Sequence, residues 1–185
     1  MATENQKNLV SKNEQYVSEF KSGDLALPPA KKYLVGKLLN MRTLMIKTDR
    51  IKVTCMDARI DPAAAFGIDL GDAHIIRNAG GNAKDALRSI LISQHLLGTR
   101  EIILVKHTGC GMLTFTNSDA LKLVAQHAGT GVLSSTFDFQ PFSELESAVK
   151  EDVEWLKANG AVVHEGVAIS GWIYEVETGK TKQVV

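Results

Sequence analysis

The sequence lacks three things: an excess of either charge, a long apolar run, and more than two cysteines. Its 21 lysines and arginines balance 21 aspartates and glutamates, so no bulk charge draws it to nucleic acid or an anionic membrane. No segment approaches the about 20 apolar residues that span a bilayer. Residues 1–20 are too polar for a signal peptide and too acidic for a transit peptide. These absences favour a cytoplasmic protein with a small or neutral partner.

Several motif classes are missing as well. The sequence has no glycine-rich phosphate loop and no Ser-His-Asp order, which argues against nucleotide binding and acyl transfer. It has no internal repeat and no low-complexity tract. A disulfide between Cys55 and Cys110 is the weaker interpretation, because thiols stay reduced in a cytoplasmic compartment. The neighbours of these two cysteines therefore decide what they do.

What the sequence does contain is an alternation of short apolar runs with helical patterns. A length of 185 residues with 44% hydrophobic content suits one domain, residues 1–185. We expect a short strand after the turn at 177–180, strands at 51–54, 74–76, 101–106 and 167–176, and helices at 86–97 and 143–159. This order predicts an α/β fold, with a mainly parallel central β-sheet flanked by helices on both faces.

The N-terminal stretch stands apart from this alternation. Apolar residues recur at loosely helical spacing over residues 5–21, and Ser22-Gly23-Asp24 ends the pattern. Pro28-Pro29 then forces an extended linker. A helix separated from the domain in this way needs another surface for its apolar stripe, and a partner subunit is one candidate. The sequence therefore predicts an N-terminal helical arm and linker over residues 1–30.

Two short fragments carry the candidate chemistry, CMDAR at 55–59 and HTGCG at 107–111, and each follows a predicted strand. The carboxyl ends of parallel strands meet at the edge of the sheet where ligands bind. Cys55, His107 and Cys110 together make a Cys₂His set, which suits Zn²⁺. Three protein ligands leave one position of a tetrahedral ion open, which is typical of a catalytic zinc site.

Asp57 and Arg59 lie beside the first of these ligands. Two thiolates cancel the charge of the zinc, so its water should be less acidic than in a three-histidine site, where its pKa is about 7. A nearby carboxylate can orient the reacting water, or it can occupy the fourth position and close the site. A bidentate pair with Arg59 would hold Asp57 away from the metal. We expect both residues to be catalytic; a purely structural ion pair is the alternative.

Three motifs in this order resemble those of the β-class carbonic anhydrases, most closely the short microbial and fungal members. They are Cys-x-Asp-x-Arg at 55–59, Arg-Asn-Ala-Gly-Gly at 77–81 and His-x-x-Cys-Gly at 107–111. The resemblance covers roughly residues 25–177, and we assign no chemical role to its middle motif. It implies that Cys55, His107 and Cys110 bind zinc and that Asp57 and Arg59 form the aspartate–arginine dyad of the family.

The resemblance also implies a β-carbonic-anhydrase-like fold and the reversible hydration of carbon dioxide to bicarbonate and a proton. It further implies a homodimer embraced by N-terminal helices, or a dimer of such dimers. Two other functions stay open. One is hydrolysis of carbon disulfide or carbonyl sulfide, because linear triatomic substrates share the geometry of attack. The other is a zinc-loaded but inactive binding or sensor protein.

Residues 36–52 depart from the family pattern. Without them, residues 32–35 would run directly into Val53-Thr54-Cys55 and form a better first strand. The segment is either a genuine insertion that forms an extra helix or a retained intron, and transcript sequencing across its codons distinguishes the two. It matters because it adjoins the strand that carries Cys55. A slip of one residue in that strand would turn the thiol away from the metal.

Overall fold

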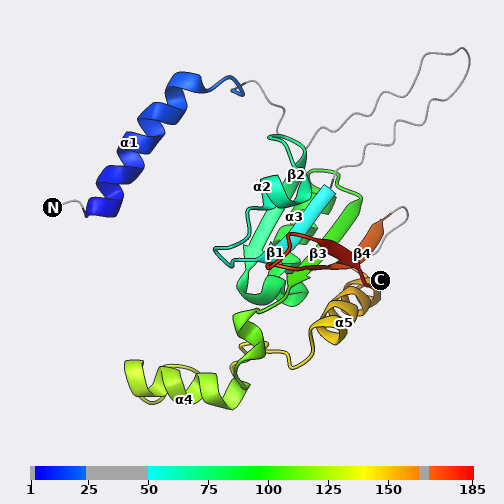
Figure 1. Ribbon diagram of the computed structural model, residues 1–185. Helices are drawn as coiled ribbons and strands as arrows, with labels where there is room; N and C mark the ends of the chain where they lie inside the picture. Colours follow the sequence, from blue (N-terminus) through cyan, green and yellow to red (C-terminus); the bar gives the residue numbers. More distant parts are fainter. Residues whose placement is uncertain (1–2, 24–49, 163–166) are drawn as a thin grey trace, which may run out of the picture.

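The computed structural model describes residues 3–23, 50–162 and 167–185 (Figure 1). In chain order, its elements are α1 (Glu4–Glu19), β1 (Arg50–Cys55), α2 (Pro62–Phe66), β2 (Ala73–Asn78), the single turn η1 (Ala79–Gly81), α3 (Ala83–His95), β3 (Glu101–His107), the single turn η2 (Gly111–Leu113), α4 (Asn117–Ala128), α5 (Leu145–Ala158), β4 (Ala168–Tyr174) and β5 (Thr181–Gln183).

The five strands form one sheet in the order β2-β1-β3-β4-β5. The pairs β1–β2, β1–β3 and β3–β4 are parallel, and β5 alone runs antiparallel, against β4. The register sets Cys55 opposite Asn78 and Thr54 opposite Val105. The carboxyl ends of the three strands that lead into the motifs therefore reach the same edge, and the predicted mainly parallel sheet is confirmed.

The core lies between one face of this sheet and the helices α3 and α5. Ile51 and Val53 of β1 and Leu104 of β3 point to this face and are fully buried against Ile90 of α3 and Val149 of α5. On the opposite face Lys52 is also buried, and its Nζ donates to the carbonyl oxygen of Phe66 in α2. The two long predicted helices therefore share one face, and the short α2 packs on the other.

Helices α1 and α4 lie away from the sheet in Figure 1, and neither buries any residue within the described part of the chain. The predicted N-terminal helix is confirmed as α1, which begins with a capping box between Thr3 and Gln6. Its large apolar side chains are exposed: Leu9, Val10, Tyr16, Val17 and Phe20. None of the described helices is long and apolar enough to cross a membrane.

Three details differ from the sequence-based expectations. Helix α2 was not predicted. For α4 the sequence indicated only a helical pattern around His127, and its start, where Thr116 and Asp119 form a capping box, was not predicted. Arg77 and Asn78, expected in a loop, are the last residues of β2. Residues 36–49 of the suspected insertion lie outside the described residues, whereas 50–52 belong to β1. The insertion hypothesis therefore stays a prediction.

Candidate metal centre

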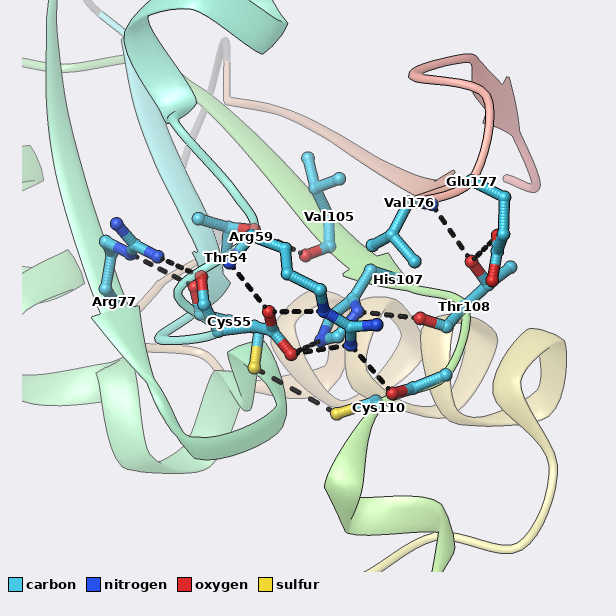
Figure 2. A network of polar contacts seen from close by, with 12 residues as sticks. Thr54, Cys55, Arg59, Arg77, Val105, His107, Thr108, Cys110, Val176 and Glu177 are labelled. Atoms are coloured by element: carbon cyan, nitrogen blue, oxygen red, sulfur yellow. Dashed lines mark hydrogen bonds and ion pairs between the residues drawn. The ribbon is translucent and has the colours of Figure 1, made fainter.

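Three predicted ligands meet at the carboxyl edge of the sheet. Cys55 is the last residue of β1, His107 is the last residue of β3, and Cys110 precedes the turn η2. Their ligand atoms all lie within 4.8 Å of one another, and all three residues are buried. The two sulfur atoms are 4.0 Å apart. Strand topology thus brings together two fragments that are distant in the sequence (Figure 2).

This donor set fits Zn²⁺. Bond lengths of about 2.3 Å to sulfur and about 2.0 Å to nitrogen set tetrahedral ligand atoms about 3.5–3.8 Å apart, close to the sulfur separation found here. The carbonyl oxygen of Thr108 lies 2.9 Å from Nδ1 of His107, so Nδ1 carries the proton and donates. Nε2 is buried and has no hydrogen-bond partner among the described residues. Its lone pair is therefore available to a metal.

The two thiols are electrostatically unequal. The hydrogen bond between the two sulfur atoms lowers the pKa of the Cys55 thiol, and burial opposes this shift. The same contact with Cys55, together with burial, raises the pKa of Cys110. The close contact between the two sulfur atoms therefore favours one thiolate shared by the pair. Zinc binding requires both protons to leave.

Asp57 and Arg59 form the bidentate pair that the sequence suggested. Nε of Arg59 donates to Oδ1 of Asp57 at 2.9 Å, and Nη2 donates to Oδ2 at 2.8 Å. The backbone N–H of Arg59 also donates to Oδ1, and these bonds hold the pKa of Asp57 well below its usual range. Oδ2 lies 3.8 Å from Nε2 of His107. The carboxylate therefore lies beside the ligand atoms with both of its oxygens bound to arginine.

Arg59 also joins the two halves of the site, because its Nη2 donates to the carbonyl oxygen of Gly109 at 3.0 Å. Gly109 has a φ of +59°, a conformation that favours glycine. It lies between the ligands His107 and Cys110. One guanidinium thus contacts the loop after β1 and the loop after β3.

Arg77, to which no role was assigned from the sequence, binds the backbone of the first metal loop. Its Nε donates to the carbonyl oxygen of Cys55 at 3.1 Å, and its Nη2 donates to that of Asp57 at 2.7 Å. The carbonyl oxygen of Asn78 accepts from the N–H of Met56. These contacts depend on the register between β1 and β2. The place of Arg77 directly after an apolar strand was the signal available in the sequence.

The glycine pair of the same motif fills a space that admits no side chain. A Cβ on Gly81 would lie 3.0 Å from the backbone nitrogen of Cys55 and 3.0 Å from the carbonyl carbon of Thr54. A Cβ on Gly80 would lie 2.9 Å from Cγ of Met112. Both glycines have positive φ, +73° for Gly80 and +60° for Gly81. The turn η1 is therefore wedged between the two cysteine-bearing loops.

Thr108 ties the second metal loop to the end of β4. Its N–H donates to the carbonyl oxygen of Tyr174, and its hydroxyl accepts from the N–H of Val176 at 3.0 Å. The same hydroxyl donates to Oε2 of Glu177 at 2.8 Å (Figure 2). The carbonyl oxygen of Thr108 accepts from His107. Thr108 therefore connects the orientation of this ligand to the C-terminal strands.

Apolar side chains surround the ligands. Ile60 and Met112 are buried with the two cysteines, and partly buried aromatic residues pack against them: Phe66, Phe115, Phe142 and Tyr174. A pocket of about 460 Å³ opens beside this cluster and is lined by Leu113, Phe115 and Phe142, among others. No metal ligand lines that pocket. The immediate surroundings of the site suit a small neutral molecule better than a charged one.

Comparison with known proteins agrees with this geometry. Residues 51–181 match the family described as carbonic anhydrase. Beta-carbonic anhydrase 1 of Mycobacterium tuberculosis is 36% identical over 176 residues, which cover 95% of this chain and 94% of that protein. Carbon disulfide hydrolase of Saccharolobus solfataricus is 36% identical over 153 residues, 71% of this chain and 74% of that protein.

A solved structure of carbonic anhydrase from Glaciozyma antarctica matches with a TM-score of 0.82 and 38% sequence identity. The match covers 100% of both chains. The family match alone spans well over half of the sequence, and the motifs that suggested the resemblance lie inside it. The protein belongs to the β-class carbonic anhydrases.

Proposed function

We propose that this protein is a zinc-dependent carbonic anhydrase, which converts carbon dioxide and water reversibly to bicarbonate and a proton. The observation that carries the proposal is the metal centre itself. Three buried ligand atoms lie within 4.8 Å of one another, and an arginine-bound carboxylate lies beside them. We assign Cys55, His107 and Cys110 as the zinc ligands and Asp57 and Arg59 as the catalytic pair.

Bound zinc supplies Lewis acidity, which lowers the pKa of a water molecule toward neutrality. The side chains around it position the reactants. The carboxylate of Asp57 accepts a hydrogen bond from the reacting water and so directs a lone pair at the carbon of carbon dioxide. One C–O bond forms while one C=O π bond of carbon dioxide breaks and its electron pair moves to that oxygen. The water gives up a proton that solvent finally takes, which leaves bicarbonate. Asp57 suits the acceptor role because Arg59 keeps its pKa low and the carboxylate ionised.

Arg59 has a restraining role in this proposal. Oδ2 of Asp57 is already 3.8 Å from Nε2 of His107, so a carboxylate released from Arg59 could itself bind the metal. Two charge-assisted hydrogen bonds from Arg59 oppose that release. The contact from Arg59 to the carbonyl oxygen of Gly109 fixes the guanidinium in turn. The pair therefore keeps one coordination position open for the reaction.

The test combines zinc analysis with stopped-flow measurement of carbon dioxide hydration. Cys110→Ala should lose most of its zinc, and its rate should fall to near background. Asp57→Asn should keep its zinc and lose about 10- to 100-fold in rate. Asp85→Asn, on an exposed part of α3, is the matched control and should resemble wild type. Wild-type zinc content and rate in Cys110→Ala would rule out the assigned site.

A second candidate is hydrolysis of carbon disulfide or carbonyl sulfide, which is favoured by the similarity to carbon disulfide hydrolases. That similarity covers a smaller part of the chain than the similarity to Beta-carbonic anhydrase 1. Parallel assays separate the two activities: sulfide release with negligible bicarbonate formation would favour this candidate. A protein with full zinc and no hydration at any pH would instead be a binding or sensor protein.

We also propose a cytoplasmic homodimer, or a dimer of dimers, in which α1 packs on a second copy. Support comes from the exposed apolar side chains of α1, among them Leu9 and Val17. The two thiols, 4.0 Å apart, also need a reducing compartment. Leu9→Asp with Val17→Asp should shift the mass in sedimentation toward the monomer, whereas Glu14→Gln should not. An unchanged mass would exclude α1 from the interface, and cell fractionation tests the compartment.

A further inference from the structure

A buried ion pair lies directly behind the metal centre and takes no part in the chemistry proposed above. Nζ of Lys106 lies 2.8 Å from Oδ2 of Asp152, and their side chains are only 1% and 9% exposed. Lys106 precedes the ligand His107 on β3, and Asp152 lies on α5. Burying such a pair usually stabilises a fold no more than a well-packed apolar pair does. Stability alone therefore does not account for it.

The ammonium group of Lys106 converges on the glycine turn. Besides Asp152, it donates to the carbonyl oxygen of Gly80 at 3.1 Å and to that of Gly81 at 3.5 Å. These three acceptors match the three N–H groups of lysine. The same ammonium lies 4.8 Å from the centre of the Phe142 ring, which packs against the apolar cluster around the two cysteines.

Asp152 anchors the other end of the turn. Its Oδ2 also accepts from the backbone N–H of Ala83, the first residue of α3, at 3.1 Å. The segment from Gly80 to Ala83 is therefore bound at both ends by one ion pair. Because α5 packs on β3 and β4, the pair couples this segment to the core of the sheet.

The Gly80-Gly81 turn packs against both cysteine loops, so its position affects theirs. Both glycines of the turn are buried. Gly81 packs against the backbone of Thr54 and Cys55 with no room for a Cβ, and Gly80 meets Met112 in the same way. A shift of the turn therefore changes the packing against the backbone of Cys55 and against Met112, which lies two residues after Cys110.

We propose that Lys106 and Asp152 are positioning residues of the zinc site, which hold the Gly80-Gly81 turn so that the spacing of the two cysteine loops matches the metal. This inference rests on the zinc site of the proposed function. Neither residue touches the reactants. Loss of the pair changes how tightly zinc is bound, beyond any change in the stability of the fold.

The test replaces the pair by apolar side chains of similar size, Lys106→Met with Asp152→Leu, which leaves no unpaired buried charge. Zinc affinity is measured on the full-length protein by competition with a chelator. We expect zinc to bind about 10- to 100-fold more weakly, as for other residues that position metal ligands. The thiolate-to-cobalt absorption of the cobalt-substituted protein should change as well. A zinc affinity within twofold of wild type and an unchanged cobalt spectrum would overturn the proposal.

Val153→Ala is the matched control, because Val153 is a buried neighbour of Asp152 on α5 that packs in the core. It should lower the melting temperature and leave zinc affinity within twofold of wild type. If Val153→Ala lost as much zinc affinity as the double variant, general destabilisation of the fold would explain both results. That outcome would overturn the proposal.

If the double variant does not fold, Asp152→Asn answers the same question. Asparagine keeps the volume and an acceptor for the N–H of Ala83 but weakens the bond to Lys106. Zinc binding several-fold weaker supports the proposal, and binding within twofold of wild type overturns it. These results differ from a failure of the proposed function, in which the wild-type protein itself would bind no zinc or hydrate no carbon dioxide.

Discussion

The two sides of the metal centre are stabilised by different kinds of contact. On the Cys55 side, the backbone of Thr54 and Cys55 lies against Gly81, where an added Cβ would be 3.0 Å from it. The His107–Cys110 side leaves the sheet and depends on Thr108, whose hydroxyl bonds to Val176 and to the exposed Glu177. Both sides therefore receive side-chain hydrogen bonds, from Arg77 and from Thr108, and the Cys55 side has close backbone packing in addition.

The difference has an energetic meaning. Backbone atoms in a close-packed interior cannot move aside cheaply, so an added atom there costs free energy of unfolding. A hydrogen bond near the surface is exchanged for one with water, so its net contribution is about 1 kcal/mol. Substitutions on the Cys55 side should therefore have larger effects than those on the His107–Cys110 side.

The largest effect is expected for Gly81→Ala. The new Cβ would lie 3.0 Å from backbone atoms of Thr54 and Cys55, at a φ of +60°. Left-handed strain and overpacking together should lower the free energy of unfolding by about 2–4 kcal/mol, as measured by chemical denaturation. Gly67→Ala is a close control, because its φ is +59° and nothing lies within 4 Å of its added Cβ. It should lose only about 1 kcal/mol. If the two variants lost the same free energy of unfolding, the close packing of Gly81 against Cys55 would make no contribution to the effect.

The next effect is expected for Arg77→Met. The substitution removes both hydrogen bonds to the carbonyl oxygens of Cys55 and Asp57 but keeps much of the side-chain volume. The first metal loop should then bind zinc about 10-fold or more weakly, and the hydration rate at limiting zinc should fall in parallel. Chelator competition measures the affinity. Arg88→Met, on an exposed position of α3, serves as the control. If Arg77→Met bound zinc as tightly as wild type, packing alone would determine the conformation of this loop.

A smaller effect is expected on the other side, for Thr108→Val. Valine keeps the shape of threonine but removes the donor to Glu177 and the acceptor for the N–H of Val176. The free energy of unfolding should fall by about 1 kcal/mol, and zinc affinity by less than 10-fold. Thr108→Ser keeps the hydroxyl and should remain near wild type. A loss in Thr108→Val larger than that in Arg77→Met would reverse the comparison between the two sides.

The cluster of candidate zinc ligands was predictable because sequence alone shows both their chemistry and their place at strand ends. Cys55, His107 and Cys110 follow apolar runs, and the topology of a parallel sheet brings such ends together. The pairing of Asp57 with Arg59 was predictable too, because two residues of opposite charge lie close together in one loop. The mainly parallel sheet followed from the order of the elements.

The supporting contacts were not predictable, because each depends on register or on packing between distant segments. Arg77 reaches the carbonyl oxygen of Cys55 only because β2 pairs with β1 in the observed register. Lys106 interrupts an otherwise apolar strand, and nothing nearby in the sequence identifies Asp152 on α5 as its partner. The bounds of α4 were missed for another reason: its capping residues were present, but it buries no apolar stripe against the described residues.

The smallest effect is expected for Glu177→Gln. This substitution tests the hydrogen bond between Thr108 and Glu177, the outermost contact of the His107–Cys110 side, and its effect should depend on pH. The hydrogen bond from Thr108 lowers the pKa of Glu177 from its ordinary value of 4.5. A carboxylate whose pKa is depressed in the folded state stabilises the protein above its unfolded-state pKa, and this contribution is lost as pH falls through the folded-state value.

Glu177→Gln should therefore lower the melting temperature slightly at neutral pH, and the difference from wild type should shrink as the pH falls below about 4.5. Thermal unfolding between pH 3 and pH 7 measures it. Glu154→Gln, on an exposed position of α5, is the control. A difference that stayed constant across this range would assign the effect to side-chain shape instead of charge. The outermost contact of the second metal loop would then be electrostatically neutral, and the contrast with the packed Cys55 side would be larger still.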